Sequence, residues 1–473
     1  MQVKLALPKG RLLSPTSRLL QNAGLGLNGY DGQSRSYRPQ CPSFPGLFLK
    51  VFHEKDVPIQ VAIGNYDLGI CGLDWIEELL AKYTSSALVK VRDLKYGRSS
   101  LCVAASKRSP LRSIEDLGSK AGAVCLATEY PNLAESFALR LRLKRFKVFP
   151  LWGAAEAYPP ENSDLALVSL PAGSPLDGGL HPLSSILSAS AFLIANRGSW
   201  ESKDLSPVLQ CLYSAGSVEE AEGESVTGQP DRAEETPAGH PFRDGDLWLG
   251  LPDGHQQGPT LELLSKAGIA VREQPGSPRR PTTNMDGVSI KMVRPQDMPV
   301  QVANGNFDLA ITGEDWLYDH LYRFPGSPVK EILKLGVGKV RIVAVVSNKL
   351  PVDSPQGLRE LLRKNGLSAL RIASEYTSIA DRYARDNHLS PYRLIPTWGA
   401  SEAFLPEDAD LLIENVQTGR TLAQHDLKII DIMFESSACL VGSTNSVGGG
   451  SKLERMKRII QALRRTINES GKE

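Results

Sequence analysis

The sequence has almost no excess charge of either sign. It carries 54 Lys and Arg residues against 53 Asp and Glu residues, which leaves a formal net charge of +1 at pH 7. A protein that binds nucleic acid over a broad face needs a clustered excess of basic residues. The composition therefore argues against a nucleic-acid-binding protein, and a basic patch, if present, is confined to a local cleft.

Long apolar runs and paired cysteines are also missing. No window reaches the roughly 20 apolar residues that a membrane-spanning helix needs, and the first ten residues, MQVKLALPKG, lack the apolar core of a signal peptide. The six cysteines are scattered, without the spacing of a zinc site or a disulfide framework. We therefore expect a cytoplasmic protein with reduced thiols and no membrane contact.

The chain does contain an internal repeat. Residues 57–80, VPIQVAIGNYDLGICGLDWIEELL, match residues 298–321, MPVQVANGNFDLAITGEDWLYDHL, at an offset of 241. Residues 150–167, PLWGAAEAYPPENSDLAL, match residues 396–413, PTWGASEAFLPEDADLLI, at an offset of 246. Slowly drifting offsets are typical of loop insertions between homologous copies, so we predict a tandem pair of units.

Composition also divides the chain. Residues 217–245 are rich in Glu, Gly and Pro and almost free of large apolar side chains, which predicts a disordered linker. The predicted units are therefore residues 1–216 and 246–473, and each should contain two lobes. We place the second lobes at about 98–184 and about 340–427.

Short apolar runs alternate with helical patterns in both units. Residues 3–7, VKLAL, read as a buried strand, and residues 14–24 read as a helix that Ser14 caps and Gly24 ends. Residues 66–71, YDLGIC, and 307–312, FDLAIT, read as strands that lead into helices. This alternation predicts an α/β fold, in which ligands bind at the carboxyl ends of strands between the lobes.

The segment IENVQTGRTL, residues 413–422, combines an acid, two threonines and a glycine after an apolar run. Backbone N–H groups at the start of a helix, together with the hydroxyls of Thr418 and Thr421, could hold a phosphate monoester. Glu414 could then accept both hydroxyls of a ribose. When the loop is considered alone, an ordinary capped turn is the better explanation.

Several motifs or their altered counterparts follow one another in matching order in the two halves: ALPKGR, the DLxIxG turn followed by DW, the EY and WGxxEA segments, the TGRTL loop and FESSACLV. In this order they resemble the ATP phosphoribosyltransferase family, the first enzyme of histidine biosynthesis, over roughly residues 1–200 and 246–445. The resemblance implies two-lobed units with mixed sheets, like type II periplasmic binding proteins. It also implies transfer of phosphoribose from phosphoribosyl pyrophosphate to N1 of ATP, with Mg²⁺ as cofactor and no metal ligands assigned.

The resemblance is to the short form of that enzyme, which works with a subunit related to histidyl-tRNA synthetase and forms dimers or larger assemblies. It implies roles for individual residues as well. Those expected to be catalytic are Lys9, Arg11, Arg294 and Glu414. Those expected to bind substrate are Arg35, Glu314, Glu402, Thr418, Gly419, Arg420 and Thr421.

The two halves keep different parts of this set. Half one has Lys9 and Arg11, but its counterpart of the TGRTL loop has Val168 in place of Glu414 and Pro175 in place of Thr421. Valine cannot hold a diol and proline has no N–H donor. Half two keeps the loop, but Asp253 replaces the lysine. Its arginine segment near 279–284 reads as displaced or degraded, so we predict an internal pseudo-dimer with one competent site that uses both halves.

Two other functions fit the same residues. A non-catalytic regulatory or scaffold paralogue would bind nucleotide without turnover, and the change to Asp253 favours it. A small-anion binding protein would share the fold class, because fold alone does not determine function. The retained Thr418–Thr421 loop and Lys9 argue against the anion binder.

Overall fold

The computed structural model describes residues 2–31, 36–84, 87–176, 179–214, 246–274, 277–365, 369–444 and 450–470. The predicted linker 217–245 and Arg35 lie outside these residues. Within them, no helix is both long and apolar enough to cross a membrane.

The first half contains two five-stranded mixed sheets. Lobe 1A has the strand order β2 (Leu47–Phe52), β1 (Val3–Pro8), β3 (Leu68–Gly72), β10 (Ala191–Asn196) and β4 (Leu88–Asp93). Lobe 1B has the order β7 (Phe146–Pro150), β6 (Val124–Thr128), β8 (Leu165–Pro171), β5 (Ser99–Ser106) and β9 (Leu180–Ala189). Three neighbouring strands of each sheet are parallel and the rest of the pairings are antiparallel.

The second half repeats both strand orders. Lobe 2A has the order β14 (Val288–Val293), β11 (Leu247–Pro252), β15 (Leu309–Gly313), β22 (Ala438–Ser443) and β16 (Val329–Lys334). Lobe 2B has the order β19 (Tyr392–Pro396), β18 (Leu370–Ser374), β20 (Leu411–Val416), β17 (Val340–Ser347) and β21 (Leu427–Ser436). A two-stranded ribbon, β12 (Val271–Gln274) and β13 (Ser277–Thr283), is added to lobe 2A.

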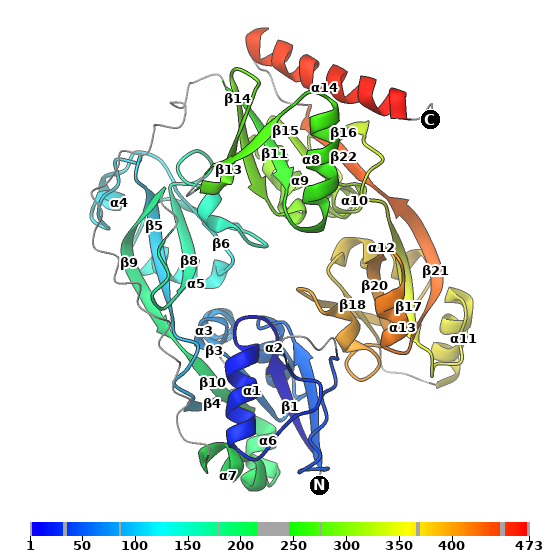
Figure 1. Ribbon diagram of the computed structural model, residues 1–473. Helices are drawn as coiled ribbons and strands as arrows, with labels where there is room; N and C mark the ends of the chain where they lie inside the picture. The colour runs from blue at the N-terminus through cyan, green and yellow to red at the C-terminus, as the bar shows by residue number, and fades with distance from the viewer. Residues whose placement is uncertain are drawn as a thin grey trace.

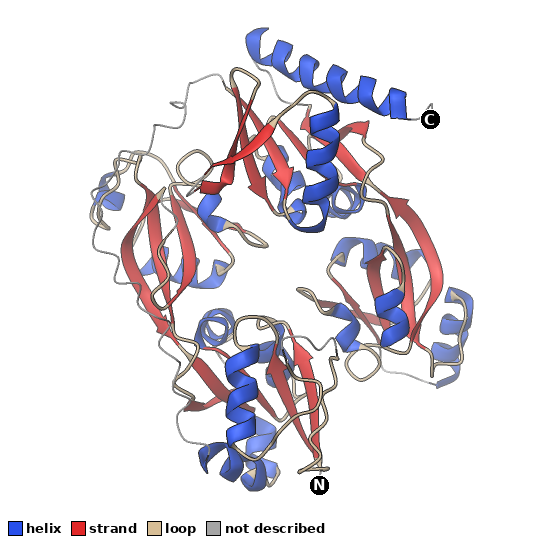
Figure 2. Cartoon of the chain, in the orientation of Figure 1, coloured by secondary structure: helices blue, strands red, loops and turns tan. Residues whose placement is uncertain are grey.

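Helices flank the sheets in each lobe (Figure 2). Lobe 1A carries α1 (Leu13–Asn22), α2 (Asp56–Ala62), α3 (Leu73–Lys82), α6 (Arg197–Ser202) and α7 (Ser206–Ser214), and lobe 1B carries α4 (Asp116–Ser119) and α5 (Pro131–Arg140). Lobe 2A carries α8 (Gln257–Lys266), α9 (Met298–Ala303), α10 (Glu314–Arg323) and α14 (Gly450–Ser470). Lobe 2B carries α11 (Pro355–Asn365), α12 (Thr377–Asp386) and α13 (Arg420–Gln424). The mixed α/β class predicted from the sequence is confirmed.

Local predictions hold with small shifts at the ends of elements. The strand predicted at residues 3–7 is β1, and the strands predicted at 66–71 and 307–312 begin two residues later, as β3 and β15. The prediction that Ser14 caps α1 is wrong, because that helix begins at Leu13 and no side chain caps it. Gly24 follows the helix with a φ of 71°, the left-handed conformation expected of a terminating glycine.

The lobes are arranged in a ring in which each half packs crosswise on the other (Figure 1). Lobe 1A shares a hydrophobic core with lobe 2B, where the rings of Phe52 and Phe404 lie 5.3 Å apart at an interplanar angle of 71°. Lobe 1B shares a core with lobe 2A, in which Tyr158 packs with Met298. The halves are therefore joined by buried apolar surface as well as by the chain.

The same polar contacts recur at the two crossed interfaces. In the first, Arg38 pairs with Glu407, and the buried ammonium of Lys50 lies 2.8 Å from Glu407 and 2.7 Å from Asp408. In the second, Arg280 pairs with Glu161, and the buried ammonium of Lys291 lies 2.9 Å from Glu161. Arg38 donates to the carbonyl of Leu405, as Arg280 does to that of Pro159. Arg280 therefore occupies the place of Arg38, so the expectation of a displaced or degraded arginine segment is wrong for this arginine, although Ser277 stands where half one has Arg35.

Candidate functional site

A cavity of about 570 Å³ lies between the two lobes of half two. This volume is within the range of sites for small molecules. Its wall consists mainly of residues from lobe 2B, and lobe 2A contributes Asp253, Gly254, His255, Arg294, Pro295, Gln296 and Trp316. One lining residue, Tyr37, comes from half one. The cavity is thus completed across the crossed interface.

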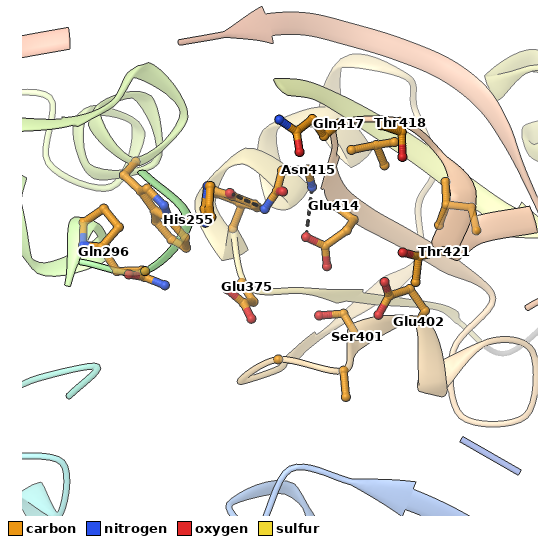
Figure 3. Close-up of a pocket in the computed structure, with 18 of the residues that line it drawn as sticks. His255, Gln296, Glu375, Ser401, Glu402, Glu414, Asn415, Gln417, Thr418 and Thr421 are labelled. Atoms are coloured by element: carbon orange, nitrogen blue, oxygen red, sulfur yellow. Dashed lines mark hydrogen bonds between the residues drawn. The ribbon is translucent and has the colours of Figure 1, made fainter. Parts of the chain in front are cut away.

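The TGRTL loop forms one side of this cavity. Strand β20 ends at Val416, Gly419 has a φ of 76°, and helix α13 starts at Arg420. A side chain at position 419 would be strained in that conformation, which explains the glycine. Thr418 and Thr421 are exposed and line the cavity, so their hydroxyls are available to a ligand. Figure 3 shows both threonines beside Glu414.

The equivalent loop of half one keeps only the turn. Strand β8 ends at Pro171, and Gly173 has a φ of 78°, like Gly419. The described residues 174–176 continue as a loop, whereas the equivalent residues after Gly419 form α13. Val168 and Pro175 stand at the positions of Glu414 and Thr421. Half one therefore lacks the hydrogen-bonding groups of the loop.

Three carboxyl groups line the same cavity as the loop. Glu375 follows β18, Glu402 lies in a short 3-10 turn at Ser401–Phe404, and Glu414 lies in β20. Burial, reinforced by the charge of Glu402, raises the pKa of Glu375 to about 7. Burial and then the charges of Glu375 and Glu402 raise the pKa of Glu414 well above its usual range. Glu414 and a fraction of Glu375 are therefore protonated near neutral pH.

Within the parts of the chain that the structure describes, no basic side chain pairs with any of these three carboxyls within 4.0 Å. Glu414 accepts a hydrogen bond from the backbone N–H of Asn415 at 2.9 Å, shown dashed in Figure 3. The described residues also contain no group of three or more His, Cys, Asp or Glu side chains that could hold a metal ion.

Several residues expected at the site line this cavity. They are Arg294, Glu402, Glu414, Thr418, Gly419 and Thr421. Lys9 is at its edge, because its ammonium lies 3.4 Å from the hydroxyl of Tyr37. The composite arrangement proposed from the sequence is thus supported by Tyr37 directly and by Lys9 through Tyr37.

Other expected residues lie outside the lining of this cavity. Arg11 is turned into its own half, 3.4 Å from Glu54 and 3.5 Å from Asp74. Glu314 is buried and pairs with Lys334 at 2.5 Å. Arg420 is exposed on the first turn of α13, and Arg35 is outside the described residues.

Asp253 does more than remove a positive charge. Its carboxylate lies 2.5 Å from Arg279 and 3.3 Å from Arg294, and Arg279 also reaches Glu156 of lobe 1B at 3.3 Å. The aspartate therefore anchors two arginines at the second crossed interface. This role was not predicted from the sequence, and neither was the presence of Tyr37, Glu375 and Gln296 at the cavity. The repeated EY motif was the available signal for Glu375.

Comparison with known proteins identifies the family. The family model for ATP phosphoribosyltransferase matches this chain twice, at residues 53–214 and 294–465. The ATP phosphoribosyltransferase of Metallosphaera sedula is 31% identical over 228 residues, covering 48% of this chain and 74% of the relative. That of Prosthecochloris aestuarii is 30% identical over 231 residues, covering 48% of this chain and 73% of the relative.

Among solved structures, an ATP phosphoribosyl transferase (HisG:HisZ) complex from Thermotoga maritima matches with a TM-score of 0.39 and 21% identity. The match covers 47% of this chain and 98% of that one. The family model accounts for well over half of this chain, and the enzyme class predicted from the sequence is confirmed. The chain belongs to the ATP phosphoribosyltransferase family, enzymes of histidine biosynthesis, and carries that family's match in both halves.

Proposed function

We propose that the chain is a cytoplasmic ATP phosphoribosyltransferase with one working site, the cavity of half two. It transfers phosphoribose from phosphoribosyl pyrophosphate to N1 of ATP and releases pyrophosphate. The observation that carries this proposal is the intact loop of Thr418 and Thr421 beside Glu414 in one cavity, against its altered counterpart in half one.

The loop and Glu414 bind different parts of phosphoribosyl pyrophosphate. The hydroxyls of Thr418 and Thr421 and the loop N–H groups hold the 5-phosphate, and Glu414 accepts hydrogen bonds from the ribose hydroxyls. The C1–oxygen bond to pyrophosphate then breaks as the bond from C1 to adenine N1 forms. Because N1 already has a free lone pair, the site needs to orient the two substrates more than to supply a strong base.

The leaving pyrophosphate needs positive charge around it. Arg294 lines the cavity, and Lys9 stands at its edge through Tyr37. Mg²⁺, when bound, neutralises charge on the pyrophosphate. Glu375, Glu402 and Glu414 line the cavity, and their carboxylate oxygens would suit an ion that also takes ligands from substrate phosphates.

The same proposal covers the assembly. Each half is a two-lobed, type II periplasmic-binding-protein-like unit, spanning residues 1–216 or 246–473, and the two units form an internal pseudo-dimer. The crossed cores and the repeated strand orders support it. We extend the proposal to a subunit related to histidyl-tRNA synthetase, which the resemblance to the short form implies. Copurification of such a subunit with the full chain tests this extension.

One observation favours a second function, a non-catalytic paralogue that binds nucleotide. Asp253 stands where half one has Lys9, and its carboxylate forms an ion pair with Arg294. Release of pyrophosphate by the full chain with ATP, phosphoribosyl pyrophosphate and Mg²⁺ decides between the two functions. Sustained release supports the enzyme. Binding of both substrates without release, with and without the partner subunit, supports the paralogue.

Lys9→Ala is expected to lower kcat/KM for phosphoribosyl pyrophosphate by about tenfold. An exposed cation at the edge of the cavity contributes less than a buried donor, and a tenfold loss corresponds to about 1.4 kcal/mol. Steady-state kinetics measure the change. Lys95→Ala is the control, because Lys95 is an exposed lysine of the same lobe that pairs with Asp93. Equal kinetics for the two variants would remove Lys9 from the site.

Binding of phosphoribosyl pyrophosphate is expected to take up about one proton and to weaken by about tenfold per pH unit above pH 7. The pKa of Glu375 is about 7, and burial and neighbouring acids raise that of Glu414. An anionic ligand raises both pKa values further, so the complex holds more protons than the free protein. Because these protons are lost as pH rises, the affinity falls with increasing pH. Calorimetry in two buffers of different ionisation enthalpy counts the protons. Affinity that is constant from pH 7 to 9 would contradict the expectation.

A further inference from the structure

The two crossed interfaces allow the halves to be compared residue by residue. Because Arg38 and Arg280 make equivalent contacts, the residues that precede them, Tyr37 and Arg279, are also equivalent. The equivalents of Glu402 and Asp253 are Glu156 and Lys9. The same place in the fold thus holds the series Asp253, Arg279, Glu156 at one interface and Lys9, Tyr37, Glu402 at the other.

At the interface between lobes 1B and 2A, the carboxylate of Glu156 is neutralised. Arg279 lies 3.3 Å from Glu156 and 2.5 Å from Asp253, so one guanidinium joins both carboxylates. The neighbouring acid of half one is neutralised as well, because Glu129 pairs with Lys55 at 2.8 Å. These carboxylates already have cationic partners within the protein.

At the interface between lobes 1A and 2B, the corresponding carboxyls of Glu402 and Glu375 have no such partner among the described residues and are available to a ligand. Tyr37 replaces the arginine, its ring lies 4.8 Å from that of His425, and the charges of Glu402 and Glu414 raise the pKa of its hydroxyl, after the larger effect of burial. Gln296 replaces Lys55, so Glu375 loses its equivalent partner. In the described part of the chain Glu402 has no cation within 4.0 Å, and both Tyr37 and Glu402 line the cavity.

We infer that Tyr37 is a specificity-determining residue, supplied by half one, that keeps Glu402 free to accept hydrogen bonds from hydroxyl or amino groups of the bound substrate. An arginine here would occupy the Glu402 carboxylate, as Arg279 occupies Glu156. Lys9 would push such an arginine towards Glu402, because its ammonium lies 5.1 Å from the centre of the Tyr37 ring. This role rests on the proposed function. It would let the site select a phosphorylated sugar, such as phosphoribosyl pyrophosphate, over an anion without hydroxyl groups, such as inorganic pyrophosphate.

The test is Tyr37→Arg in the full chain, with phosphoribosyl pyrophosphate and inorganic pyrophosphate as the two calorimetric probes. Tyr37→Arg is expected to lower the affinity for phosphoribosyl pyrophosphate by about tenfold or more, because the ribose hydroxyls lose a charged acceptor. The affinity for inorganic pyrophosphate should stay equal or improve. The uptake of about one proton should disappear, since a permanent cation lowers the pKa values of nearby carboxyls. A purely structural role for Tyr37 would not change proton uptake.

Two further variants keep the result interpretable. Tyr37→Phe retains the ring and adds no charge, so it should lose much less affinity than Tyr37→Arg. Ser36→Arg adds the same charge at the preceding exposed residue, and it should change affinity by less than about twofold. Unchanged affinity and unchanged proton uptake in a folded Tyr37→Arg variant would overturn the inference. If the unaltered chain itself fails to bind phosphoribosyl pyrophosphate, the proposed function fails instead.

Discussion

Thr418→Ala combined with Thr421→Ala is expected to weaken binding of phosphoribosyl pyrophosphate by about 10²–10⁴-fold while ATP binding changes little. Each hydroxyl makes a hydrogen bond to a charged phosphate, worth about 1.5–3 kcal/mol. The loss of both therefore costs about 3–6 kcal/mol, and about 1.4 kcal/mol corresponds to tenfold. Both side chains are exposed in the cavity, so their removal leaves the packing of the lobe intact. Isothermal titration calorimetry with each substrate separately measures the two affinities.

The matched control lies in the other half. Ser174 belongs to the half-one loop, at the position equivalent to Arg420, and Ser174→Ala should leave both affinities within about twofold. Gly173→Ala is a poor control, because Gly173 has a φ of 78° and alanine there would strain the turn. Unchanged affinity in the double threonine variant would disprove the assignment of this loop to the phosphate.

Glu407→Ala combined with Asp408→Ala is expected to destabilise the chain by about 3–5 kcal/mol, because it leaves a buried cation without partners. Lys50 has a side-chain exposure of 0% and lies within 2.8 Å of both carboxylates. Burial already lowers the pKa of Lys50, and loss of the two charges that oppose this shift lowers it further. Urea unfolding followed by circular dichroism measures the loss.

A third substitution separates this cause from simple loss of contacts. Adding Lys50→Met to the double variant removes the unpaired charge and should restore part of the stability. Asp353→Ala is the surface control, since Asp353 pairs with Lys428 while 88% exposed, and it should cost less than about 1 kcal/mol. If the triple variant is no more stable than the double variant, the buried charge is not the cause.

Local features of the site could be predicted from the sequence, because short-range chemistry determines them. The apolar run before Glu414 requires a buried strand, and the glycine at 419 marks a turn with a positive φ. The position of the Thr418 and Thr421 hydroxyls around that turn can be predicted from the local sequence alone. Strands β5 and β17 follow in the same way from the apolar runs at residues 100–105 and 340–346.

Features that depend on crossed packing could not be predicted. Tyr37 and Glu402 line the same cavity only because lobe 1A packs on lobe 2B, and no local pattern encodes proximity over that distance in the chain. Asp253 looks like the loss of a cation in the sequence, although in the structure it is the counter-ion of Arg279 and Arg294. Glu314 was expected at the site from its motif, but the start of α10 directs it to Lys334 and Ser437.

The crossed arrangement of lobes in one chain has a consequence for how such a protein can evolve. In an assembly of two identical copies, one codon change alters both sites at once, so a charge reversal that suits one contact is imposed on the other. Here Lys9 and Asp253 are encoded separately, and so are Tyr37 and Arg279. Selection can therefore preserve chemistry at one location while the other accumulates ion pairs that only hold the molecule together.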